Sequence, residues 1–166
     1  MIVGLALLLV VPLTGCAKAA EKVSEKVAEK AIENASGGNA NVDLSNNGGT
    51  VKVQTDQGSA TYGGGEIPDS IDVPFPSGGT VMVSTEASTG ASVMVQYDGG
   101  NFDDIVATFQ NWVDNSSDQY EPVSVDAGGV RTQSWSSETT TIGVQTCGSD
   151  SGSMDSICVY VTVNKS

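Results

Sequence analysis

Residues 139–147 read TTTIGVQTC, and residues 157–164 read ICVYVTVN. In both stretches apolar residues alternate with other types, which is typical of a strand that buries one face. Only a short connection separates them, so they are predicted to pair as an antiparallel hairpin. Cys147 and Cys158 stand at the ends that this hairpin would bring together, and we expect them to form a disulfide.

The two cysteines also suggest a register for the hairpin. If Cys147 lies opposite Cys158, then Val144 lies opposite Val161, and the apolar residues of both strands share one side of the sheet. The bridge would add about 3 kcal/mol of stability by the chain-entropy estimate. Two free thiols on the sheet surface are the alternative interpretation.

The sequence before these strands predicts an amphipathic helix from about Phe102 to Asn115. Asn101 is a good N-cap, and Asp103 and Asp104 would stand in the first turn, where the helix dipole favours negative charge. The apolar positions recur at the spacing of one helix face: Phe102, Ile105, Val106, Phe109, Trp112 and Val113. A helix with one such face needs a sheet against which to bury it.

Four further stretches complete the pattern of a sheet. Alternating residues predict strands at about 80–85, 91–97, 120–126 and 130–136. The expected fold of residues 66–166 is therefore α+β, with the element order β-β-α-β-β-β-β and the helix on one face of an antiparallel sheet.

Trp135 is the aromatic residue that we single out as a possible ligand platform. Its strand has an outward face that the alternation leaves undecided, and only 5% of the residues are aromatic. Tyr97 and Tyr160 are the other rings on which a sugar could stack. Burial of Trp135 in the core is the competing interpretation.

Residues 41–62 predict a smaller β-meander of three short strands. Turn residues separate three alternating runs, which are Val42/Leu44, Val51/Val53 and Ala60/Tyr62. Three strands are about the minimum for stability, so their thin apolar face needs a cover, either the predicted stalk helix, residues 18–34, or the main domain. Gly63, Gly64 and Gly65 then predict a linker and a boundary between residues 39–65 and 66–166.

Residues 18–34 read KAAEKVSEKVAEKAIEN and predict a helical stalk, because Ala, Glu and Lys are strong helix formers. The stalk belongs to a predicted anchor region, residues 16–38. Its apolar residues form a narrow stripe: Val23, Val27, Ala28, Ala31 and Ile32. Such a helix would space a domain about 25 Å from a membrane. A coiled-coil seam is the alternative.

Residues 1–15, MIVGLALLLVVPLTG, predict a signal peptide, because the apolar run is shorter than the roughly 20 residues of a transmembrane helix. With Cys16 they end in Leu-Thr-Gly-Cys, which resembles the lipobox of bacterial lipoproteins. The resemblance implies lipid transfer to Cys16 and cleavage after Gly15. Together with the stalk and the α+β domain, it makes the chain similar to small, uncharacterised envelope lipoproteins. It implies a site on the cell membrane or outer membrane, with the domain facing the periplasm or exterior.

The charge of the chain excludes several classes of function. The net charge is −13, and the segment from Glu66 onward has two basic residues against fourteen acidic ones. Such a chain repels nucleic acid. Histidine is absent, which removes the commonest general base and the commonest zinc ligand.

Two acidic loops are the remaining candidates for chemistry, residues 98–104 and the pair Asp150 and Asp155. Neither has the ligand order of an EF-hand, and solvated turns explain both. The sequence therefore predicts a lipid-anchored envelope protein that displays a small acidic binding or structural domain. We expect no catalysis, metal or cofactor, membrane contact through the lipid, and an envelope protein or glycan as partner. The alternatives are a carboxylate-dependent envelope hydrolase and a calcium-dependent adhesion module.

Overall fold

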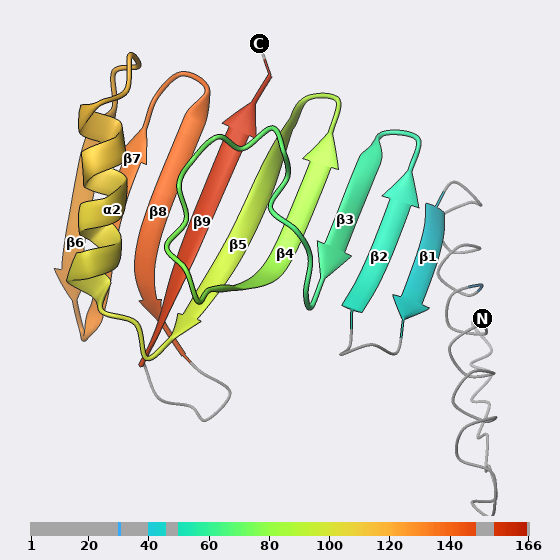
Figure 1. Cartoon of the computed structure of the whole chain (residues 1–166), viewed down its shortest axis with the longest axis horizontal. Coiled ribbons are helices and arrows are strands. Elements are labelled where there is room, and N and C mark those ends of the chain that lie inside the picture. The colour runs from blue at the N-terminus through green and yellow to red at the C-terminus, as the bar shows by residue number, and fades with distance from the viewer. Residues whose placement is uncertain (1–29, 31–39, 46–49, 149–154, 166) are drawn as a thin grey trace, which may run out of the picture.

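The computed structural model describes residues 30, 40–45, 50–148 and 155–165. In these residues it forms a nine-stranded antiparallel sheet with one long helix packed on it (Figure 1). The α+β class is confirmed, with strands in the majority. Cys16, the predicted leader and all of the predicted stalk except Lys30 lie outside the described residues.

The chain adds strands inward from both edges of the sheet and ends at the central pair, β5 and β9. The elements are β1 (Ala40–Ser45), β2 (Thr50–Thr55), β3 (Gly58–Tyr62), β4 (Thr80–Ala87), β5 (Gly90–Asp98), α2 (Phe102–Asp114), β6 (Glu121–Ala127), β7 (Val130–Ser136), β8 (Thr140–Cys147) and β9 (Ser156–Asn164). Their order in the sheet is β1-β2-β3-β4-β5-β9-β8-β7-β6. The helix therefore carries the chain from the centre to the β6 edge, and β9 returns to pair with β5.

Local sequence explains where α2 begins and which face it buries. The Asn101 side chain caps the helix by accepting a hydrogen bond from the Asp103 backbone N–H at 2.9 Å. Ile105 and Phe109, one turn apart, are its buried residues, and the helix packs on β8. We call the side of the sheet that carries α2 the front face and the opposite side the back face.

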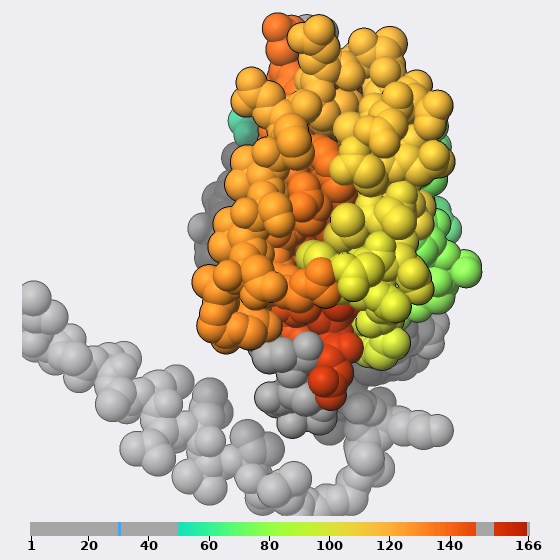
Figure 2. Space-filling view, turned by 90° about the vertical axis from the view of Figure 1, so that its left-hand side faces the viewer, coloured from blue at the N-terminus to red at the C-terminus, as the bar shows by residue number. Residues whose placement is uncertain are grey.

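The segment 63–79, whose start we predicted as a linker, forms part of the cover of the front face. Ile71 and Val73 are buried, and the ring of Phe75 packs edge-on against Phe109 with centroids 5.9 Å apart. Gly79 approaches β5 so closely that a Cβ atom would overlap Val95. Figure 2, seen from the β6 edge, shows this green segment and the yellow α2 on one side of the strands.

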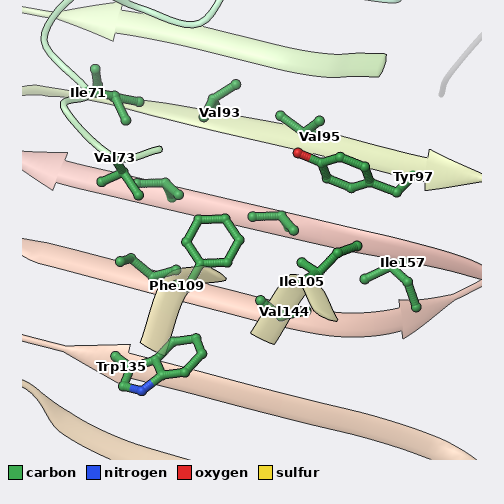
Figure 3. Close-up of a cluster of buried hydrophobic side chains, with 14 residues drawn as sticks. Ile71, Val73, Val93, Val95, Tyr97, Ile105, Phe109, Trp135, Val144 and Ile157 are labelled. Atoms are coloured by element: carbon green, nitrogen blue, oxygen red, sulfur yellow. The ribbon is translucent and has the colours of Figure 1, made fainter. Parts of the chain in front are cut away.

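One hydrophobic core lies between the front face and these two covers. Figure 3 shows its side chains gathered over neighbouring strands, among them those of Phe109 and Trp135. The buried apolar residues are Ile71, Val73, Ala91, Val93, Val95, Tyr97, Ile105, Phe109, Trp135, Ile142, Val144, Ile157, Val159 and Val161. These residues come from α2, the covering segment and strands β5 and β7–β9. The sheet itself continues from β4 into the meander, because β3 pairs with β4. The predicted division at Gly65 stays a prediction.

The disulfide between Cys147 and Cys158 is present, with Cα atoms 5.8 Å apart, but the register predicted around it is wrong by two residues. Cys147 lies opposite Ser156, and Val144 lies opposite Val159 instead of Val161. The bridge therefore runs diagonally. A two-residue slip keeps every side chain on its original face, so alternation cannot detect it.

Candidate functional site: the open back face of the sheet

The back face is uncovered in the described part of the chain, and it carries the large apolar side chains that reach solvent. These are Tyr62, Met94, Val123, Val125 and Val130, which are between 36% and 57% exposed. Strand pairing places all five on the back face, because each alternates with residues that point toward α2 or lies directly opposite residues that point away from it. Apolar side chains that gather on one face are typical of an interaction surface.

The apolar side chains of the back face form a row that crosses the strands. Successive partners across the ladder are Val51, Tyr62, Val83, Met94, Tyr160, Gly143, Ser134 and Val123. We call this set the transverse row. The Tyr160 ring lies over Gly143, where a Cβ atom would overlap it, so the ring covers the backbone of the neighbouring strand.

A second row beside the first consists of hydroxyl side chains. Its members are Thr85, Ser92, Thr162, Thr141 and Ser136, which are strand partners in that order. Thr85 and Ser92 share a hydrogen bond of 2.7 Å. The centre of the back face is thus uncharged, and it suits a neutral, partly apolar partner better than an ion.

The front face of β2–β4 has the opposite character. Lys52, Thr61, Ser84 and Glu86 point to this side, where they line a cavity of about 610 Å³ beside the start of the covering segment. The apolar side of the sheet therefore changes from front to back within β4, where Val81 packs on the front core and Val83 lies on the back. This change leaves the apolar face of the meander on the side that α2 does not cover.

A second cavity, of about 920 Å³, lies at the end of α2 and carries several carboxylates. Asp118, Glu121 and Glu138 line it together with Tyr120. The Tyr120 hydroxyl is buried and has no hydrogen-bond partner among the described residues. In this same part of the chain, no cluster of three His, Cys, Asp or Glu side chains is placed to hold a metal ion.

The first acidic loop is occupied by structural contacts. Asp98 accepts hydrogen bonds from Gln96 and Ser156, both at 2.8 Å, and these bonds lower its pKa. Asp103 accepts a hydrogen bond from Arg131 at 2.6 Å, which lowers the pKa of that carboxyl. Each carboxylate therefore fixes one element to another. Of the second predicted loop, Asp155 is exposed and Asp150 lies outside the described residues.

Trp135 is a core residue and offers no platform to a ligand. It is 1% exposed, and its indole Nε1 donates a hydrogen bond to Gln110 Oε1 at 3.0 Å. Tyr97 is also buried; its hydroxyl donates to the Pro76 carbonyl, and burial raises its pKa to about 12. Of the three rings named from sequence, only Tyr160 belongs to the open back face.

The sequence did not predict the transverse row, although the apolar alternation of the meander was visible in it. Val51 and Val53 mark an apolar side of the meander, but alternation within a strand does not tell which side of a larger sheet that is. The side depends on the register shift in β4, which pairs with β5, and on the pairing of β5 with β9, a strand far away in sequence.

Comparisons with known proteins add no relative to these observations. No protein-family model, curated protein or solved structure matches the chain. Among the described helices, none combines the length and apolar character needed to cross a lipid bilayer.

Proposed function

We propose that this chain is a bacterial envelope lipoprotein that displays an acidic, non-catalytic binding domain. In this proposal the chain is cleaved after Gly15, carries lipid on Cys16, and reaches its domain through a helical stalk, residues 18–34. The apolar leader and the Leu-Thr-Gly-Cys tetrapeptide support the anchor. A disulfide between Cys147 and Cys158 supports an oxidising compartment.

The open back face is the observation that supports binding as the role. The polar groups that could have suggested catalysis in the acidic loop, Asp98 and Asp103, have structural partners. The back face instead combines exposed valines with uncharged hydroxyls. An envelope protein or a neutral glycan has the matching chemistry, whereas a strong negative charge disfavours nucleic acid.

Mass spectrometry of the protein from membrane fractions tests the anchor. We expect an N-terminus at Cys16 that carries acyl chains, and a Cys16→Ser variant that leaves the membrane fraction. An uncleaved and unlipidated N-terminus would contradict the anchor and leave the binding role to be judged separately.

Photo-crosslinking in intact cells tests the binding role. Neighbouring positions on β6 provide a matched pair, because Val123 is on the back face, whereas Ser124 is on the front. We expect p-benzoylphenylalanine at position 123 to capture a partner and the same group at position 124 to capture much less. Equal capture at both positions, or none at 123, would contradict binding through the back face.

A further inference from the structure

We infer that the chain's own stalk, residues 18–34, docks on the meander end of the back face. The docking surface, which we call the back patch, consists of Val51, Val53, Ala60, Tyr62, Val83 and Met94. This inference goes beyond the proposed function and does not depend on lipid at Cys16, because it concerns only contacts within one chain.

The back patch is an apolar sheet face without a cover in the described residues. A three-stranded meander needs its apolar face covered to be stable. The main domain, one of the two covers expected from sequence, contacts the meander edge to edge through pairing of β3 with β4. Both front covers, α2 and the segment 63–79, lie on the opposite side (Figure 2). Edge pairing leaves the apolar side of Val53 and Tyr62 uncovered. Of the two covers expected from sequence, the stalk helix is therefore the one that can still cover this side.

The stalk is the right size for the patch and is tethered beside it. Residues 35–39 separate it from β1, which pairs with β2 at the edge of the sheet. Five extended residues reach about 17 Å. A helix of residues 18–34 would be about 25 Å long, and the distance from β2 to β5 is about 14 Å. The stalk can therefore fold back over the whole patch.

The two surfaces also match in chemistry. The stalk carries equal numbers of Lys and Glu, so its net charge is zero. Its apolar stripe, which would have no partner within a helix of its own, consists of Val23, Val27, Ala28, Ala31 and Ile32. On the described strands β2–β4, the back face carries no charged residue, since Lys52 and Glu86 point to the front. Docking would bury the stripe while leaving the charged side of the stalk in water.

The tether favours this occupant over a second copy of the chain. A short flexible connection holds the stalk at an effective concentration in the millimolar range, far above the concentration of a second molecule in dilute solution. Docking would also divide the back face. The meander end would hold the stalk, and the β6 end with Val123 and Val125 would stay open for a partner.

Oxidation of Met94 measures whether the patch is covered. The chain from position 16 onward, carrying Cys16→Ser, is treated with dilute hydrogen peroxide, and oxidation of Met94 is followed by mass spectrometry. Val27→Glu with Ile32→Glu should speed this oxidation by about fivefold or more, because the undocked patch exposes Met94. Lys22→Glu changes the net charge by the same amount on the opposite side of the stalk and should leave the rate unchanged. Equal rates in all three proteins would overturn the inference.

A photo-crosslinker in the stalk identifies the occupant without relying on reactivity. p-Benzoylphenylalanine at position 27 should label peptides of β2–β5 within the same chain, and at position 22 it should not. Labelling only between chains, or protection of Met94 that grows with protein concentration, would assign the patch to a second copy instead. Labelling of the front face would place the stalk elsewhere and overturn the inference as well.

Discussion

The two ends of the sheet bury their apolar residues on opposite sides. In β5, β9 and β8 the valines and isoleucines point to the front, where α2 and the segment 63–79 cover them. In β2 and β3 the apolar residues point to the back. Both ends show the same alternation in sequence. Alternation therefore predicts that each strand has one apolar face, but it does not predict on which side of the sheet that face lies.

A β-bulge in β4 produces the change of side. Val81 pairs with Val95 and packs on the front core, whereas Val83 pairs with Met94 on the back. Without the register shift between them, two residues that are two positions apart would share one face. The extra residue, Met82, turns the rest of β4 over, and β3 and β2 follow. One residue thus separates a covered half from an open half.

Truncation of a core residue on the covered half should have the largest effect on stability. Phe109→Ala removes a fully buried ring that contacts Phe75, and we expect a loss of about 3–5 kcal/mol in the free energy of unfolding. Val53→Ala on the back face, measured in a chain whose stalk is kept undocked by Val27→Glu and Ile32→Glu, should cost about 1 kcal/mol or less. Urea unfolding followed by tryptophan fluorescence measures both. Similar losses in the two variants would show that the two halves are equally well packed, which would contradict the difference between them.

Removal of the disulfide should have the next largest effect. The bridge joins β8 and β9 in the covered half, across a sequence separation of 11 residues. Replacing both cysteines by serine should lower the free energy of unfolding by about 3 kcal/mol on the chain-entropy estimate. Urea titrations of the oxidised protein, the reduced protein and the double variant check this value. An unchanged midpoint after reduction would mean that β8 and β9 are held by pairing alone.

Much of the covered half was predictable because its signals are local. Asn101 caps α2 as expected, and the apolar spacing of the helix gives the buried side of Ile105 and Phe109. The strand positions follow from alternation and turn residues. These signals lie within a dozen residues of one another, so no knowledge of the tertiary structure was needed.

The remaining features depend on contacts between distant residues. The diagonal disulfide reflects a register slip of two, which leaves the pattern of faces intact. The segment 63–79 has too few apolar residues to mark it as a cover, and only the position of β5 beneath it buries Ile71 and Val73. Trp135 is buried because Gln110, which is 25 residues away, supplies its hydrogen-bond acceptor.

Loss of the hydrogen bond between Gln110 and Trp135 should destabilise the covered half by an intermediate amount. Gln110→Leu leaves the buried indole N–H without an acceptor, which should cost about 2 kcal/mol. Gln110 Nε2 also donates a hydrogen bond to Asp114 at 2.7 Å, so Gln110→Glu is combined with Asp114→Asn. This pair of changes keeps an acceptor oxygen for the indole and should cost less. Urea unfolding of the two variants provides the comparison. If leucine is tolerated as well as glutamate, apolar contact rather than the hydrogen bond holds α2 against β7.

The smallest effect concerns the ion pair that ties the start of α2 to β7. Arg131 donates a hydrogen bond to Asp103 and lies over the Phe102 ring at 4.3 Å from its centroid. That bond lowers the pKa of Asp103 below its ordinary value of 3.8. A carboxyl with a lowered folded-state pKa stabilises the protein above its unfolded-state pKa, and this contribution is lost as the pH falls through the folded-state value.

Asp103→Asn should therefore reduce the thermal midpoint slightly at neutral pH, and the difference from the parent protein should disappear as the pH falls through the lowered folded-state pKa of Asp103. Both partners are exposed, so added salt should also shrink the difference. Asp104→Asn, which removes a neighbouring charge from the same helix turn, serves as the control and should not reproduce the pH dependence attributed to the pair. A difference between parent and Asp103→Asn that does not shrink as the pH falls below 3.8 would show that the side chain acts through packing rather than charge. In that case apolar contact alone, and no electrostatic link, would hold the helix cover on the front of the sheet.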